Sequence, residues 1–226
     1  PQVLAEMVVE AGADLGLAHD GDADRLIAVD EKGNLVNGDH IMAICGLDLL
    51  RRGMLPRNTI VATVYSNLGL SKTFAREGGN VVITQNGDRY VLEEMRKLDV
   101  ILGGEQSGHV IFLDRNTTGD GIITALALLS VLRRTGGKLS ELASWMDVYP
   151  QVLVNVNVTD KRGLFSNSAV NRAIERAQAL MSKDGRIFVR PSGTESLVRI
   201  LGEGPEESVV RAAVYEVARV IQEELG

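Results

Sequence analysis

Three aspartates at alternating positions, in the run Asp20-Gly21-Asp22-Ala23-Asp24-Arg25, are the strongest chemical signal in the chain. Like charges this close repel one another unless a positive charge lies between them. A hard divalent cation supplies that charge, and a ligand set made only of oxygen suits magnesium, calcium or manganese better than zinc. Apolar residues at 15–18 and 26–29 predict short buried strands on both sides. The run is therefore predicted to be a metal-binding loop between two strands.

Three other interpretations compete for the acidic run. Most isolated acidic runs are solvated turns. The aspartates also occupy positions 1, 3 and 5 of an EF-hand loop, but that loop needs glycine at its sixth position, where this chain has Arg25, and a strand-like segment follows instead of a helix. A phosphatase loop of the haloacid dehalogenase type, with Asp20 as the nucleophile after a buried strand, fits the local pattern and stays open.

A second loop, residues 190–195, has the composition of a phosphate-binding site. Arg190 supplies a planar guanidinium that matches phosphate oxygens, and Arg199 on the next predicted strand supplies another. Pro191 stiffens the loop, and Gly193 is expected to permit an unusual backbone angle. The hydroxyls of Ser192 and Thr194 and successive backbone N–H groups can form a concave site for an anion. The alternative is a polar hairpin turn, which seldom combines two arginines, two hydroxyls and a glycine.

A third loop, residues 103–109, carries Gly104, Glu105, Ser107 and His109 between glycines that let a ligand approach the backbone. A carboxylate beside a hydroxyl can bind vicinal sugar hydroxyls, and a histidine near a phosphate can carry charge or a proton. A glycine-rich turn with a chance histidine explains the loop almost as well. Residues 87–90, Gly-Asp-Arg-Tyr, form a fourth candidate at a predicted helix start, where Asp88 as an ordinary N-cap is at least as good an explanation.

Composition excludes several classes of protein. The chain has 226 residues and a net charge of −6 without a basic stripe, which argues against nucleic acid as the main partner. It has no apolar run long enough to span a bilayer, and its first residues do not resemble a signal peptide. Cys45, the only cysteine, cannot form an internal disulfide, which indicates a reducing and hence cytoplasmic compartment. No Walker A loop, nucleotide-binding glycine motif or C-x-x-C pair is present.

The periodicity of apolar residues predicts a mixed-sheet α/β region followed by a small α+β domain, an antiparallel sheet with two helices. The change falls near Tyr149-Pro150, which places a boundary close to residue 147. No internal repeat is visible in the sequence. The helices are predicted at 3–12, 38–52, 71–77, 88–97, 119–134, 139–146, 168–182 and 206–225, and the later strands at 59–65, 80–84, 100–103, 110–113, 152–159, 186–189 and 197–202.

With these loops in view, the chain resembles the α-D-phosphohexomutase family over essentially its whole length. Residues 20–25 match the family's magnesium loop, 104–109 its sugar-binding loop and 190–195 the phosphate loop of its last domain. Residues 64–70, 87–91 and 117–121, together with Gln106, favour the branch that acts on glucosamine phosphates. Three features depart from the family pattern: Ala23 replaces a glycine, Ser196 a proline, and Gln85-Asn86 a Lys-Val pair.

The resemblance implies a domain plan and an activity. Residues 1–36 would be the end of the second α/β domain with the metal loop, 37–146 the third domain with the sugar loop, and 147–226 the phosphate-binding domain. The family transfers a phosphoryl group from a phosphoserine in its first domain through a bisphosphate intermediate. No such serine loop is present here, so the chain is expected to be an inactive fragment whose partner is the missing domain.

The resemblance also assigns roles to residues. Asp20, Asp22 and Asp24 would hold magnesium (Mg²⁺), and Arg25 and His109 would act in catalysis. Glucose and mannose phosphates are the alternative substrates, and a homodimer is compatible with the family. A non-catalytic module that binds a sugar phosphate is a more remote alternative, as is the phosphatase above. The residues expected to bind the phosphorylated hexosamine are Gly104, Glu105, Ser107, His109, Arg190, Ser192, Gly193, Thr194 and Arg199.

Overall fold

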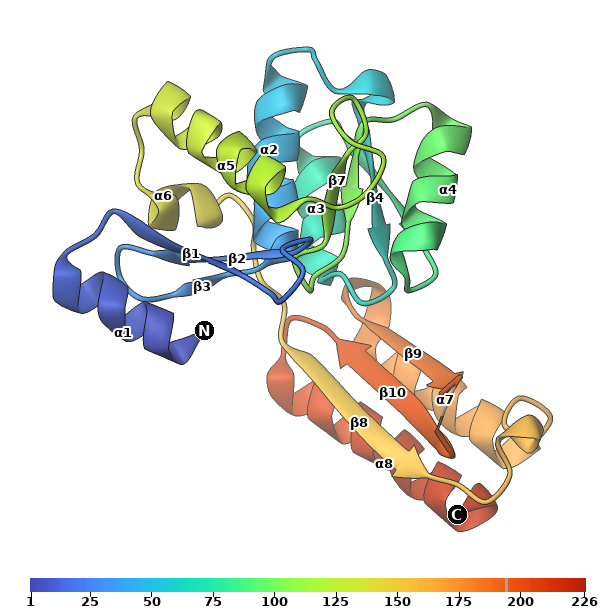
Figure 1. Cartoon of the computed structure of the whole chain (residues 1–226). Helices are drawn as coiled ribbons and strands as arrows, with labels where there is room; N and C mark the ends of the chain where they lie inside the picture. Colours follow the sequence, from blue (N-terminus) through green and yellow to red (C-terminus); the bar gives the residue numbers. More distant parts are fainter. Residues whose placement is uncertain (194) are drawn as a thin grey trace. The chain divides into compact units, whose positions relative to one another are not determined.

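The computed structural model describes residues 1–193 and 195–226, with the side chain of Ser182 left aside. The chain forms two compact units, Pro1–Asp147 and Val148–Gly226, and each is described by itself. Within the described residues, no helix is both long and apolar enough to cross a membrane. Figure 1 shows the elements of both units.

The first unit begins with a helix, α1 (Gln2–Ala11), and a three-stranded antiparallel sheet. Its strands are β1 (Leu15–His19), β2 (Leu26–Asp30) and β3 (Leu35–Val36), in the order β1-β2-β3. Helix α1 ends because Gly12 adopts the left-handed conformation (φ 60°), which glycine tolerates without strain. The β1–β2 register pairs Gly16 with Val29 and His19 with Leu26, so the acidic run becomes the loop that closes this hairpin.

A four-stranded sheet follows in the same unit, with the order β5-β4-β6-β7. Strand β4 (Thr59–Thr63) lies parallel to both β5 (Asn80–Thr84) and β6 (Leu102–Gly104), and β7 (Val110–Phe112) is antiparallel to β6. The connections carry a short 3₁₀ turn, η1 (Pro56–Asn58), and the helices α3 (Leu68–Arg76) and α4 (Asp88–Leu98). Parallel strands joined by helices are the α/β arrangement expected from the sequence, and this fold class is confirmed.

Helices α2 (Gly38–Arg51), α5 (Gly121–Thr135) and α6 (Leu139–Ala143) complete the first unit. Helix α2 packs against α5, α3, α6 and strand β6, so it lies at the centre of the core. The largest fully buried side chains of this unit include Leu26, Ile41, Ile44, Leu47, Ile60, Leu70, Phe74, Leu102 and Leu128. A second cluster, around Val61, Val91, Met95 and Ile111, lies between α4 and the four-stranded sheet.

The second unit is a separate α+β fold. Its antiparallel sheet has the order β8-β10-β9, formed by β8 (Gln151–Asn157), β9 (Arg186–Pro191) and β10 (Leu197–Glu203). Helices α7 (Ser168–Met181) and α8 (Glu207–Leu225) pack against each other and against the sheet, with two short 3₁₀ turns, η2 (Lys161–Gly163) and η3 (Ser182–Asp184). The buried core includes Val170, Val198, Ile200, Val214, Val217 and Ile221. The predicted sheet with two helices is therefore confirmed.

Candidate functional site

The three aspartates of the acidic loop lie together at the end of the β1–β2 hairpin. One carboxylate oxygen from each of Asp20, Asp22 and Asp24 lies within 4.8 Å of the others. Oδ1 of Asp24 is buried and accepts no hydrogen bond from any residue that the structure describes. A buried carboxylate oxygen without a donor is costly unless a cation neutralises it. The donor set consists only of oxygens and is compact, so it fits Mg²⁺.

Backbone strain shapes the same loop. Ala23 has a φ of 59°, in the left-handed region that glycine occupies without penalty, at a cost of about 1 kcal/mol. Its carbonyl oxygen accepts a hydrogen bond from Gly121 N at 2.9 Å, and its N–H donates to Asp20 O at 3.2 Å. The first bond ties the loop to the start of α5, and the second closes a turn within the loop. The glycine that the family pattern has at this position would remove the strain.

Arg25 and His109 both lie beside the aspartates. Nε of Arg25 lies 3.6 Å from Oδ2 of Asp20 and 3.9 Å from Oδ1 of Asp24, and this side chain is half exposed. Nε2 of His109 lies 3.4 Å from Oδ2 of Asp24, and the ring is buried. The ring fits there because residue 119 is a glycine: a Cβ at Gly119 would lie 2.3 Å from the histidine Nε2. The two predicted catalytic residues thus meet the predicted metal ligands.

The loop between β6 and β7 reaches the acidic loop through its backbone. Arg25 and His109 form an isolated antiparallel bridge, and Leu26 N donates to Gly108 O at 3.0 Å. Gly108 has a φ of 98°, so the tight turn there requires a glycine. Gly104 lies so close to the returning strand that a Cβ would approach His109 O to 2.6 Å.

The carboxylate of Glu105 holds two neighbouring segments. Its Oε1 accepts a hydrogen bond from Gly87 N at 2.9 Å, and its Oε2 accepts one from the Ser107 hydroxyl at 3.4 Å. Residues 87–90, the fourth candidate segment, are therefore joined to the predicted sugar-binding loop by the hydrogen bond from Gly87 to Glu105. Asp88 is not the N-cap, since Gly87 occupies that position, and Arg89 pairs with Glu93 on the exposed face of α4.

The second unit carries the phosphate-loop candidates between β9 and β10. Arg190 lies on β9 opposite Arg199 of β10, and the buried Ser192 donates its N–H to Leu197 O at 2.8 Å. Nη2 of Arg199 lies 3.0 Å from Oε2 of Glu195. The expectation for Gly193 was wrong, because it does not have a positive φ; its Cβ position is open space, so the residue keeps the loop surface unobstructed. Thr194 lies outside the described residues.

Lys161 is a functional candidate that sequence reasoning missed. Its Nζ donates to Ser192 O at 2.7 Å and to Glu195 O at 3.1 Å, so one ammonium group holds two backbone carbonyls of the phosphate loop. A lysine that donates to backbone carbonyl oxygens belongs to no sequence motif, and 31 positions separate Lys161 from Ser192. No local signal in the sequence identifies such a contact.

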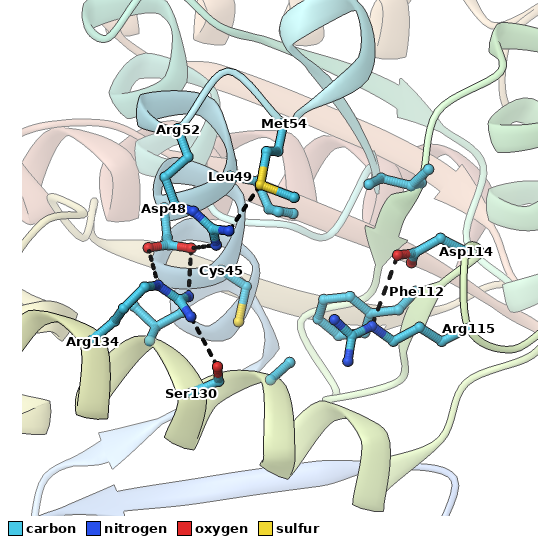
Figure 2. A pocket seen from close by; sticks show the side chains of 13 residues that line it. Cys45, Asp48, Leu49, Arg52, Met54, Phe112, Asp114, Arg115, Ser130 and Arg134 are labelled. Carbon is cyan, nitrogen blue, oxygen red and sulfur yellow. Dashed lines mark hydrogen bonds and ion pairs between the residues drawn. The ribbon is translucent and has the colours of Figure 1, made fainter.

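A separate pocket of about 190 Å³ lies between α2, α5 and the end of β7 (Figure 2). Arg134 binds Asp48 through Nε at 3.2 Å and Nη2 at 2.7 Å, while Nη1 of Arg52 binds the same carboxylate at 3.0 Å. Burial, followed by the charge of Asp48, raises the pKa of the Cys45 thiol to about 12. None of the predicted site residues lines this pocket, whose lining carries three arginines and two aspartates.

Comparison with known proteins places the chain in a family. The model described as phosphoglucomutase/phosphomannomutase, alpha/beta/alpha domain III, matches residues 37–149, and the model of the C-terminal domain of the same proteins matches residues 153–220. The chain belongs to the phosphoglucomutase/phosphomannomutase family. The resemblance found in the sequence is therefore confirmed.

Named relatives agree with this assignment. Phosphoglucosamine mutase of Carboxydothermus hydrogenoformans is 57% identical over 98% of the chain, and that of Ligilactobacillus salivarius is 53% identical over 100%. Each alignment covers 50% of the relative, so the chain spans about half the length of the curated relatives it matches.

Solved structures show the same fold. N-acetylphosphoglucosamine mutase of Aspergillus fumigatus, in complex with GlcNAc-6P and magnesium, matches with a TM-score of 0.78 at 23% identity over 92% of this chain and 48% of that one. A phosphoglucomutase/phosphomannomutase family protein of Burkholderia thailandensis matches with a TM-score of 0.79 at 23% identity over 98% of this chain and 49% of that one.

Proposed function

We propose that the chain is the carboxy-terminal half of a phosphoglucosamine mutase, which interconverts glucosamine 6-phosphate and glucosamine 1-phosphate. The observation that supports this best is the cluster of Asp20, Asp22 and Asp24 with Arg25 and His109, formed by two hairpin loops. The names of the relatives at 53–57% identity support glucosamine as the sugar. Glucose and mannose phosphates are the alternative, since the family model carries both names.

The chemistry needs a phosphoryl donor that we assign to the amino-terminal half of the relatives. A phosphoserine there would pass its phosphoryl group to the free hydroxyl of glucosamine 6-phosphate. The serine oxygen leaves, the sugar hydroxyl loses its proton, and glucosamine 1,6-bisphosphate forms. The sugar then returns its other phosphoryl group to the serine and leaves as glucosamine 1-phosphate. Such transfers depend on positioning and charge neutralisation.

The residues of this chain would supply that positioning. When held by Asp20, Asp22 and Asp24, Mg²⁺ supplies positive charge to the oxygens of the transferring phosphoryl group. Arg25 would contact the same oxygens from the side of Asp20. His109, held beside Asp24, would accept the proton that the sugar hydroxyl releases.

Binding of the sugar and of the other phosphate would use the remaining loops. Glu105 and Ser107 would bind two adjacent sugar hydroxyls, with Gly104 leaving room for the ring. The carboxylate of Glu105 already bonds Gly87 N, which fixes its direction. The phosphate that does not react would be bound by Arg190, Ser192, Gly193, Thr194 and Arg199.

Activity measurements test this proposal. The chain alone is expected to produce no glucosamine 1-phosphate, whereas adding the amino-terminal half of the Carboxydothermus relative is expected to restore turnover. The variant Asp24→Asn should abolish the restored turnover, and Asp99→Asn, which removes the same charge from an exposed position on α4's end, should not. Turnover by the chain alone would refute the need for a second half. Covalent phosphorylation of Asp20 would instead support a phosphatase of the haloacid dehalogenase type.

A further inference from the structure

One lysine of the second unit contacts the predicted phosphate loop without belonging to it. Lys161 lies in the 3₁₀ turn η2, and its Nζ donates to the backbone carbonyls of Ser192 and Glu195. Among the described residues, these two carbonyl oxygens are its only hydrogen-bond partners, and no carboxylate there forms an ion pair with it. The ammonium group therefore holds backbone, and the backbone that it holds belongs to a candidate anion site.

The sheet of the second unit places Lys161 beside this loop. Strand β8 is antiparallel to β10, with Asn157 opposite Leu197. The contact continues past the end of β8, because Val158 N donates to Ser196 O at 3.1 Å. The chain after β8 therefore runs alongside the residues that lead from the loop into β10, and Lys161 follows three positions after Val158.

The turn that carries Lys161 is anchored on both sides. Before it, Thr159 N donates to the last carbonyl of α8 at 2.8 Å. Asp160 caps the turn, since its Oδ1 accepts from Arg162 N at 2.9 Å. After it, Leu164 is buried in the core of the unit. These contacts give the ammonium group a defined place relative to the sheet.

The hydrogen bond to Ser192 O sets the direction of the next N–H group. No described peptide bond is cis, and in a planar trans peptide the C=O and N–H groups point in opposite directions. Because Ser192 O faces the ammonium group of Lys161, the N–H of Gly193 faces the other way. No described residue accepts a hydrogen bond from Gly193 N, and a Cβ at this exposed position would meet nothing within 4 Å. The N–H is thus open to a ligand on the outer side of the loop.

The charges around the loop favour an anion as that ligand. Arg199 lies 3.0 Å from Oε2 of Glu195, so part of its charge is already offset. Lys161 has no such carboxylate among the described residues, and its side chain is half-buried. A charge in this position is screened by solvent less than an exposed one. Its positive potential therefore acts on the loop that it holds.

We propose that Lys161 is a positioning residue of the phosphate loop: its ammonium group holds the carbonyls of Ser192 and Glu195 and thereby presents the N–H of Gly193 to a bound phosphate. Lys161 acts through the backbone, because its Nζ lies on the carbonyl side of the peptide and the N–H lies on the other. The inference rests on the proposed function in one respect, the assignment of residues 190–195 to phosphate binding.

Titration of the chain of residues 1–226 with inorganic phosphate, followed by NMR of the ¹⁵N-labelled protein, tests the inference. In the natural chain the amide signal of Gly193 is expected to shift as phosphate binds, because its proton enters a charge-assisted hydrogen bond. Lys161→Met is expected to lower phosphate affinity about tenfold, the effect of losing one hydrogen bond to a charged group. Lys161→Arg keeps the charge and the N–H donors, so its affinity is expected to stay within about threefold of the natural value.

Arg162→Met is the matched control. It removes the same charge from the next residue, whose side chain is 90% exposed and pairs with Asp160. Its phosphate affinity is expected to stay within about threefold of the natural value, because exposed charges are screened. Amide signals of β9 and β10 show whether each variant keeps its sheet. A purely structural role of Lys161 would lower the melting temperature and leave the affinity of the folded protein unchanged. The Gly193 signal is measured in the natural chain, so it remains decisive even if Lys161→Met loses its sheet.

Four outcomes would overturn the inference. They are no phosphate binding by the natural chain, binding that leaves the Gly193 amide signal unmoved, equal affinities of the natural chain and Lys161→Met, and equal losses in Lys161→Met and Arg162→Met. The turnover assay decides the proposed reaction separately. Lys161-dependent phosphate binding without restored turnover would support this inference and refute the reaction, and restored turnover that is insensitive to Lys161→Met would do the reverse.

Discussion

Asp22 is expected to lower the stability of the metal-free chain and to raise its affinity for a metal ion. Three carboxylates within 4.8 Å repel one another when no cation is bound. We expect Asp22→Asn to lower Mg²⁺ affinity at least tenfold and to raise the melting temperature of the metal-free chain by about 2 °C. Calorimetric titration and thermal unfolding measure the two effects. Asp99→Asn is the control, and equal behaviour of the two variants would argue against a metal site.

His40 makes the stability of the first unit depend on pH. Burial lowers the pKa of this histidine below its ordinary value of 6.5, and its Nδ1 lies 2.8 Å from Oδ1 of Asn37, the residue that caps α2. A lowered pKa means that the unfolded chain binds the proton first as the pH falls. The contribution to stability is therefore complete above pH 6.5 and is lost as the pH drops from 6.5 through the lower folded-state pKa.

The variant His40→Gln isolates that effect. We expect the free energy of unfolding of the natural chain to fall between pH 7 and pH 5 more steeply than that of the variant, because glutamine does not titrate in this range. Urea unfolding at several pH values measures the difference. Parallel curves for the two proteins would mean that His40 contributes nothing to the pH dependence.

Among the elements, those with strong local signals could be predicted, and those set by distant contacts could not. The acidic loop and the β6–β7 loop follow from the residues themselves, because glycines and flanking apolar strands act locally. Helix α3 was predicted to start at residue 71, but it begins at Leu68, since the Asn67 side chain caps it by accepting from Gly69 N. The role of Lys161 depends on a residue 31 positions away, and the fit of His109 depends on Gly119, which lies outside the loop that carries the histidine.

Helices α2 and α5 are joined by an ion pair whose loss is predicted to be costly. Asp48 on α2 is 10% exposed and accepts hydrogen bonds from Arg52 and from Arg134 on α5. We expect Asp48→Ala to destabilise the first unit by about 2 kcal/mol, because it leaves two guanidinium groups without their counter-charge. Both guanidinium groups are partly exposed, so the loss is smaller than for a fully buried ion pair. Chemical denaturation measures it. The exposed pair of Arg211 and Glu207 is the control, and Glu207→Ala should cost less than about 0.5 kcal/mol.

At the scale of the whole molecule, each hydrophobic cluster of the described residues lies within a single unit. The first unit has a main core around α2 and a smaller cluster under α4, and the second has one core where α7 and α8 pack on their sheet. The division between Asp147 and Val148 falls close to the boundary that the change of pattern near Pro150 predicts. The assignment of 1–36 and 37–146 to separate domains stays a prediction, since the two segments share one compact unit here.

Separate cores predict separate responses to core mutations. Ile60 on β4 and Ile200 on β10 are both fully buried, one in each unit. We expect either isoleucine-to-alanine substitution to destabilise its own unit by about 2–5 kcal/mol through lost burial and the cavity left behind. The other unit should keep its stability, because the two cores do not share residues. Hydrogen exchange of β4 and β10 amides reports each unit separately. If Ile60→Ala accelerated exchange in β10 as strongly as in β4, the units would unfold as one and the two-core description would be wrong.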